Sequence, residues 1–166
     1  MTEGAVMSDE PVQGRMTTDG DREVVVFLIG MRVNSWRAVR SWLPVFRAMP
    51  RMLKELARDP DSGMLAYRPL VGPGRSFGVL QYWDSKEKLF AYATDPDGAH
   101  RPAWAAFNRR AREGRNKVGF WHETYVVPAG SYESIYVNMP SFGLGKALGT
   151  VPVGRRGERA ADRMAA

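Results

Sequence analysis

The sequence predicts an α+β fold in which helices cover one face of an antiparallel sheet. Apolar runs rich in β-branched residues, typical of strands, alternate with segments whose apolar residues recur at helical spacing. In chain order these segments are β-α-β-β-α-β(β). The second and third strands are separated only by the turn Gly72-Pro73-Gly74, which is typical of antiparallel neighbours. These observations predict a ferredoxin-like unit.

The composition restricts the chemistry of the protein. The chain has 166 residues, which suits one domain with a core, and it contains no cysteine. The absence of thiols excludes disulfides, thiolate zinc sites, iron–sulfur clusters and a cysteine nucleophile. No apolar run reaches the length of a membrane span, and the N-terminus lacks the pattern of a signal peptide. We therefore expect a cytoplasmic protein without a membrane partner.

The formal net charge of +6 invites comparison with nucleic-acid-binding proteins. Arginines recur along the expected first helix and again between Arg109 and Lys117. No zinc-finger spacing, RNP motif or basic zipper accompanies them. We interpret the arginines as a solvated surface and expect no nucleic-acid partner, while an acidic small molecule or partner stays compatible with the charge.

The expected domain covers residues 23–153. Residues 1–22 are polar and aperiodic, which predicts a disordered leader, and residues 154–166 have the composition of a second flexible tail. The domain opens with an apolar run over residues 23–33, typical of a strand buried on both faces. Since both alternating sets of this strand are apolar, the second sheet face also needs a cover. A second copy of the sheet would supply it, which predicts a homodimer.

The remaining elements follow in order. A broad apolar helix face comes after the first strand, where Pro44 and Pro50 predict a kink or a break into two helices. Residues 63–85 predict two strands around the turn. A capping pattern then starts a helix that "DPDG" interrupts, and a second helix begins near Pro102 or reaches back to His100. Two paired strands, "VGFWHETYVV" and "YESIYVN", complete the unit.

One of the two histidines, His122, lies in the middle of an expected strand. Strand alternation points His122 and Glu123 to opposite faces, so they cannot form a catalytic pair. The second histidine of an H-E-x-x-H zinc site is missing, and we expect no metal site. If its face lines a cavity, His122 is a candidate general base, with Tyr136 or Asn138 of the next strand holding an oxyanion. Otherwise it is a hydrogen-bonded core histidine.

Two further groups of residues are candidates for binding. His100 lies at an expected helix N-terminus, where the helix dipole disfavours the imidazolium and keeps a nitrogen free. It is therefore either a neutral ligand or base, or a surface histidine that caps the helix. Four aromatic residues are assigned to a pocket for a planar substrate, although ordinary core packing explains each of them as well: Tyr82, Trp83, Trp104 and Tyr125. Tyr136 would complete this pocket.

Several stretches resemble a bacterial family whose members are described as "monooxygenase family protein". They are "VVVFLIGMRVN", "MPRMLKEL", "QYWDSKEKLFAYATDPDGAHRPAWAAFNRR", "VGFWHETYVV" and "YESIYVNMPSFGLGKA". The resemblance implies the dimeric α/β-barrel superfamily. It also implies a monooxygenase-like oxidoreductase that acts on a small aromatic or polycyclic molecule, either without a cofactor or with heme.

The heme alternative concerns His100. In small heme-degrading members of the superfamily a histidine of the second helix binds iron, and "YWDSKEKLFAYATDPDGAHRPAW" is similar, with His100 at the matching position. The "DPDG" break and the "RPAW" continuation depart from that pattern. The alternatives are therefore a heme enzyme of the heme monooxygenase or aldoxime dehydratase type, or a ligand-binding dimer without catalysis.

Overall fold

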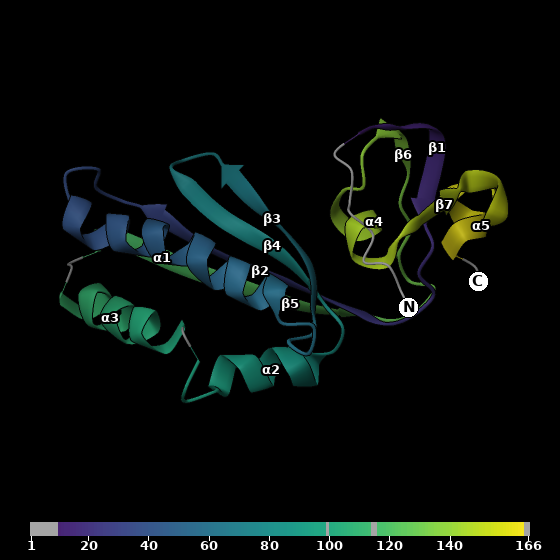
Figure 1. Cartoon of the computed structure of the whole chain (residues 1–166). Helices are drawn as coiled ribbons and strands as arrows, with labels where there is room; N and C mark the ends of the chain where they lie inside the picture. The colour runs from purple at the N-terminus through teal and green to yellow at the C-terminus, as the bar shows by residue number, and fades with distance from the viewer. Residues whose placement is uncertain (1–9, 99, 114–115, 165–166) are drawn as a thin grey trace. The chain divides into compact units, whose positions relative to one another are not determined.

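A computed structural model describes residues 10–98, 100–113 and 116–164. The chain divides into two compact units (Figure 1). The central unit comprises Val25–Val126, and the terminal unit combines Met1–Val24 with Val127–Ala166. This division differs from the single domain that we expected over residues 23–153, because a short separate sheet joins segments from both ends of the chain.

The central unit is ferredoxin-like, as predicted. Its sheet has the strand order β3-β4-β2-β5. The strands are β2 (Val24–Val33), β3 (Met64–Gly72), β4 (Ser76–Trp83) and β5 (Val118–Val127), and the helices are α1 (Val39–Arg58), α2 (Lys86–Thr94) and α3 (His100–Glu113). The central strands pair antiparallel, and the β3–β4 turn is the predicted one. Figure 1 shows α1 lying along this sheet.

The core identifies which face of the sheet the helices cover. Val25 of β2 is the register partner of Trp83 of β4, and neither side chain is exposed to solvent. Both pack in one cluster with Leu56 of α1 and Leu89 of α2. Because strand residues alternate between faces, the odd-numbered residues of β2 point towards the helices. We call this side the helix-covered face.

Helix α1 runs unbroken over 20 residues, with Pro44 and Pro50 inside it. The break into two helices that the prolines predicted is therefore absent. An interior proline costs about 3 kcal/mol in a helix. Here Leu53 and Leu56 are buried on the sheet side, and this burial offsets the cost. The helix begins at Val39, and its N-cap residue Ala38 makes no side-chain hydrogen bond.

The terminal unit is built on a three-stranded sheet of order β6-β1-β7. Its elements are β1 (Val12–Thr18), β6 (Tyr136–Met139), α4 (Gly143–Leu148), β7 (Thr150–Pro152), the 3₁₀ helix η1 (Val153–Arg155) and α5 (Ala160–Met164). Strand β1 lies in the segment that we expected to be a disordered leader. Its buried residues Thr17 and Thr18 are polar, and both hydrogen-bond with Ser134, so no apolar alternation marks the strand.

Two further expectations are corrected in this unit. Strand β6 pairs with β1, whereas β5 pairs with β2, so the predicted β5–β6 pair does not form. The segment expected to be a flexible C-terminal tail contains α5, and its Arg163 is only 6% exposed. The Arg163 guanidinium donates to Glu133 Oε2 over 2.8 and 3.0 Å and to two backbone carbonyls. The bonds to Glu133 tie the segment to a residue 30 positions away, and those to the carbonyls of Gly157 and Glu158 hold it to itself.

In the described part of the chain, no helix is both long enough and apolar enough to cross a membrane.

Candidate functional site

A row of side chains crosses the helix-covered face from β3 to β5. Tyr67 is the register partner of Gln81, and Gln81 is the partner of Phe27. The Phe27 ring in turn lies 5.9 Å from the His122 ring, centroid to centroid, with 43° between their planes. The contact places His122 on the same face as Phe27. This row of Tyr67, Gln81, Phe27 and His122 is the candidate site.

His122 is the accessible member of the row. Its side chain is exposed, whereas Phe27 is half-buried and Gln81 is 5% exposed. Glu123 lies on the opposite face, where it accepts a hydrogen bond of 2.7 Å from the Tyr125 hydroxyl. That hydrogen bond raises the pKa of Tyr125. The prediction that His122 and Glu123 do not pair agrees with this geometry.

Gln81 is a buried polar side chain in an otherwise apolar strand. Its Oε1 accepts a hydrogen bond of 2.9 Å from the indole nitrogen of Trp83. Since an indole nitrogen only donates, this bond fixes which end of the carboxamide is the oxygen. The NH₂ end of Gln81 is then the end that can donate to a ligand. Sequence reasoning missed this residue, and its signal was the lone polar residue within "FGVLQYW".

Tyr92 of α2 lies beside Trp83, on the helix side of the sheet. Its ring lies 5.7 Å from that of Trp83. Burial raises the pKa of Tyr92 to about 12, and the charges of Glu55 and Asp95 add to the effect. The phenol therefore stays neutral near pH 7. It can act as a hydrogen-bond donor but not as a base.

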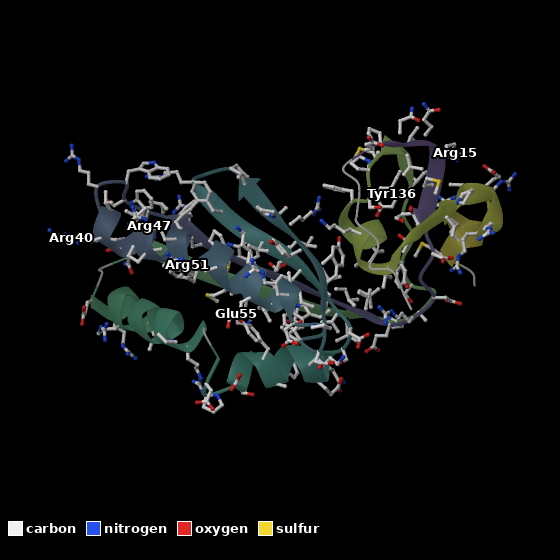
Figure 2. All side chains as sticks on the ribbon, in the orientation of Figure 1. Arg15, Arg40, Arg47, Arg51, Glu55 and Tyr136 are labelled. Atoms are coloured by element: carbon white, nitrogen blue, oxygen red, sulfur yellow. The ribbon has the colours of Figure 1, made fainter. Side chains whose placement is uncertain are left out.

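Tyr136 and Asn138, the expected partners of His122, belong to the terminal unit. The Tyr136 hydroxyl accepts a hydrogen bond of 2.8 Å from the backbone nitrogen of Gly145 in α4. The Asn138 side-chain oxygen accepts one of 2.9 Å from the backbone nitrogen of Gly14 in β1. Both side chains thus hold elements of their own unit together. Figure 2 shows Tyr136 within that unit.

The structure places the described residues of the predicted aromatic pocket on two different faces of the sheet. Trp83 points to the helix-covered face, and its neighbour Tyr82, the register partner of Val26, points to the other. Tyr125 is 51% exposed and lies on the face opposite His122. Of the predicted pocket residues with described side chains, Trp83 alone lies beside the candidate row.

A comparison with known families identifies the chain. Residues 24–144, which include the whole candidate row, match the family model described as Monooxygenase af470-like. The chain belongs to this family. A curated relative, Monooxygenase af470 of Aspergillus fumigatus, is 30% identical over 146 residues, which cover 82% of this chain and 50% of the relative. The chain therefore spans half the length of the curated relative that it matches.

Two solved structures are similar to this Monooxygenase af470-like protein, and the first of them shows its fold. The aldoxime dehydratase OxdRE, crystallised with butyraldoxime, superposes with a TM-score of 0.60 at 20% identity, over 87% of this chain and 41% of that chain. SnoaB, a cofactor-independent oxygenase from Streptomyces nogalater, gives a TM-score of 0.43 at 16% identity, over 62% of this chain and 91% of that chain.

His100 and Trp104 lie on α3 of this Monooxygenase af470-like chain, and their side chains fall outside the described residues. The prediction that His100 binds heme therefore stays a prediction, as does the place of Trp104 in a pocket. Among the residues that the structure describes, no group of three or more His, Asp or Glu side chains could hold a metal ion.

Proposed function

We propose that this chain is a monooxygenase for a small aromatic or polycyclic molecule, with His122 as the general base. The observation that supports the proposal most is the contact between the exposed His122 and the half-buried Phe27, one strand from the Gln81 carboxamide. Membership of a monooxygenase family agrees with this chemistry.

The spacing of the row suits a flat substrate. Gln81 and His122 stand on strands that flank the strand of Phe27. The distance from the first to the third of three neighbouring strands in a sheet is about 10 Å. A polycyclic ring stacked on Phe27 would therefore reach both polar groups. An aromatic ring favours offset or tilted stacking on another ring, which Phe27 would provide.

The proposed reaction needs no external reductant. A nitrogen of His122 takes a proton from an activated CH₂ group of the substrate, and the Gln81 NH₂ donates to the oxygen on which the resulting negative charge is shared. The carbanion then reduces O₂. The carbon loses two hydrogens and gains one oxygen as a carbonyl, and the second oxygen leaves as water. The sum is R₂CH₂ + O₂ → R₂CO + H₂O.

A second copy of the chain is the proposed cover for the other sheet face. Leu28 and Leu80 are register partners on that face, and both are half-buried. The Trp121 ring packs so closely on Gly30 that a Cβ atom at position 30 would lie 2.7 Å from the ring. Trp121 is nevertheless 36% exposed. Apolar faces of this kind favour association across a two-fold axis.

Oxygen uptake with anthrone tests the proposed reaction, because its CH₂ group lies between two aromatic rings that conjugate it with the ketone on the opposite side of the central ring. We expect one O₂ consumed for each quinone formed, at a rate above the uncatalysed oxidation and without added reductant. An absorption spectrum of the purified protein tests the heme alternative. A Soret band that disappears in His100→Ala would overturn the cofactor-free mechanism, and binding of anthrone without oxygen uptake would support a ligand-binding dimer instead.

A further inference from the structure

Helix α1 carries an open groove that the candidate site does not include. Its volume is about 670 Å³. Three arginines line it, at positions 40, 47 and 51, together with the apolar Leu43, Pro44 and Ala48. Figure 2 marks Arg40, Arg47 and Arg51 along the helix. The groove thus combines a row of cations with an apolar floor.

The groove is turned away from the sheet. Leu56 is buried in the core cluster, and nine residues separate it from Arg47. Nine residues make about two and a half helical turns, which places the two side chains on opposite sides of the helix. Arg51 likewise lies opposite Leu53, because two residues correspond to about 200°. The groove therefore stands apart from His122, and the inference holds whether or not His122 is a base.

The positive charge of the groove is not neutralised by the described side chains. None of the ion pairs among them involves Arg40, Arg47 or Arg51. The next carboxylate along this side of α1 is Glu55, one turn beyond Arg51, and its charge raises the pKa of Tyr92. Like charges four residues apart destabilise a helix. Arg47 and Arg51 have this spacing, so an anion between them would relieve the repulsion.

We propose that the groove binds a small organic acid, with its carboxylate between Arg47 and Arg51. Four residues span about 6 Å of helix, so both guanidinium groups can reach one carboxylate. The apolar body would lie on Leu43 and Pro44 and extend towards Arg40, about 10 Å from Arg47. We favour a small molecule over a protein partner because the row of three arginines spans only about 17 Å of one helix.

Fluorescence titration with dansylaminohexanoic acid and with its uncharged methyl ester tests the proposal. Both probes have the same apolar body, and only the acid carries the carboxylate. We expect the acid to bind wild-type protein at least tenfold more tightly than the ester. The double variant Arg47→Gln/Arg51→Gln should weaken binding of the acid at least tenfold and leave binding of the ester unchanged.

Arg58→Gln is the control for net charge, because it removes one positive charge from the last residue of α1, outside the groove, whereas the groove variant removes two. We expect it to change the dissociation constant of the acid less than twofold, and melting curves should show that all variants fold. Equal binding of acid and ester to wild type would overturn the proposal. So would a loss in Arg58→Gln that is as large, for each charge removed, as the loss in the groove variant, which would indicate a general effect of net charge.

Discussion

The two units use their polar side chains in opposite ways. In the terminal unit, Tyr136, Asn138 and Arg163 bind backbone atoms or a carboxylate of the same unit. In the central unit the helices and strands are held largely by apolar packing, while the His122 side chain stays exposed. Polar residues that look catalytic in the sequence are thus structural in one unit and accessible in the other. For this reason we propose the chemistry in the central unit.

The kinds of contact also differ. One end of α1 packs through a set of edge-to-face aromatic rings that ends on Phe77 of β4. In the terminal unit the buried contacts include Thr17 with Ser134 and Arg163 with Glu133. Apolar packing tolerates volume-conserving changes, whereas breaking a buried polar pair leaves a partner without its hydrogen bonds. The terminal unit should therefore be more sensitive to the loss of single polar groups.

The largest effect is expected from Arg163→Ala. This change leaves Glu133 and two carbonyls without their donor. Breaking a buried pair costs about 3–5 kcal/mol. Because the Glu133 side chain is 28% exposed, we expect about 2–4 kcal/mol here. Urea unfolding of the variant and of Arg159→Ala, an exposed arginine of the same segment, measures the difference. Equal stability of the two variants would contradict the structural role of Arg163.

Leu80→Lys tests the proposed dimer of the central unit. The substitution adds a charge in the middle of the apolar sheet face, so we expect the dimer dissociation constant to rise at least tenfold, which corresponds to about 1.4 kcal/mol. Sedimentation over a range of concentrations measures it. Val71→Lys is the control, because Val71 is already 82% exposed at the end of β3. A wild-type protein that is monomeric at micromolar concentration would exclude the dimer.

Tyr136→Phe separates a structural from a catalytic tyrosine. It removes the acceptor of the Gly145 backbone nitrogen, which lies in a buried residue. We expect the free energy of unfolding to fall by about 1–2 kcal/mol, with no change in kcat for anthrone oxidation. Thermal melting and oxygen uptake measure the two quantities. A loss of activity at unchanged stability would instead indicate that Tyr136 is a catalytic residue.

The smallest effect is expected from Tyr92→Phe, and it depends on pH. The pKa of Tyr92 is raised from 10.0 to about 12 in the folded protein. Between these values the folded state keeps the phenol proton that the unfolded state has lost. The folded state is therefore fully stabilised by this difference below pH 10, and the stabilisation disappears as pH approaches 12. After a discount for partial exposure we expect about 1 kcal/mol. In Tyr92→Phe the loss of stability from pH 10 to pH 12 should be smaller by this amount.

The same contrast explains which parts of the fold could be predicted. The central unit follows from local patterns: β2 is a continuous apolar strand and α1 has an apolar face, so their order gave the ferredoxin-like fold. Strand β1 escaped prediction because its buried residues are threonines that hydrogen-bond with Ser134, more than a hundred positions away. No local pattern reveals such a partner.

Only part of the candidate site could be predicted from the sequence, for a similar reason. Alternation within β5 correctly separated His122 from Glu123, because that property is local to one strand. The partners of His122 depend on which strands pair. We expected β6 beside β5, whereas β6 pairs with β1 in the other sheet. The strand beside β5 is β2, which brings Phe27, with Gln81 on the strand beyond. Pairing between distant strands is set by the whole fold, so Gln81 had no visible link to His122.

The most direct test of the account compares His122→Asn with Glu123→Gln, its neighbour on the opposite face of the same strand. Because His122 is exposed, the substitution should change the free energy of unfolding by less than about 0.5 kcal/mol. It should also lower kcat/KM for anthrone oxidation by about a hundred-fold or more, as loss of a general base does. Glu123→Gln should leave kcat/KM within about twofold of wild type. If His122→Asn keeps full activity, or loses activity only in proportion to a loss of folded protein, His122 is not the base and the proposed chemistry is wrong.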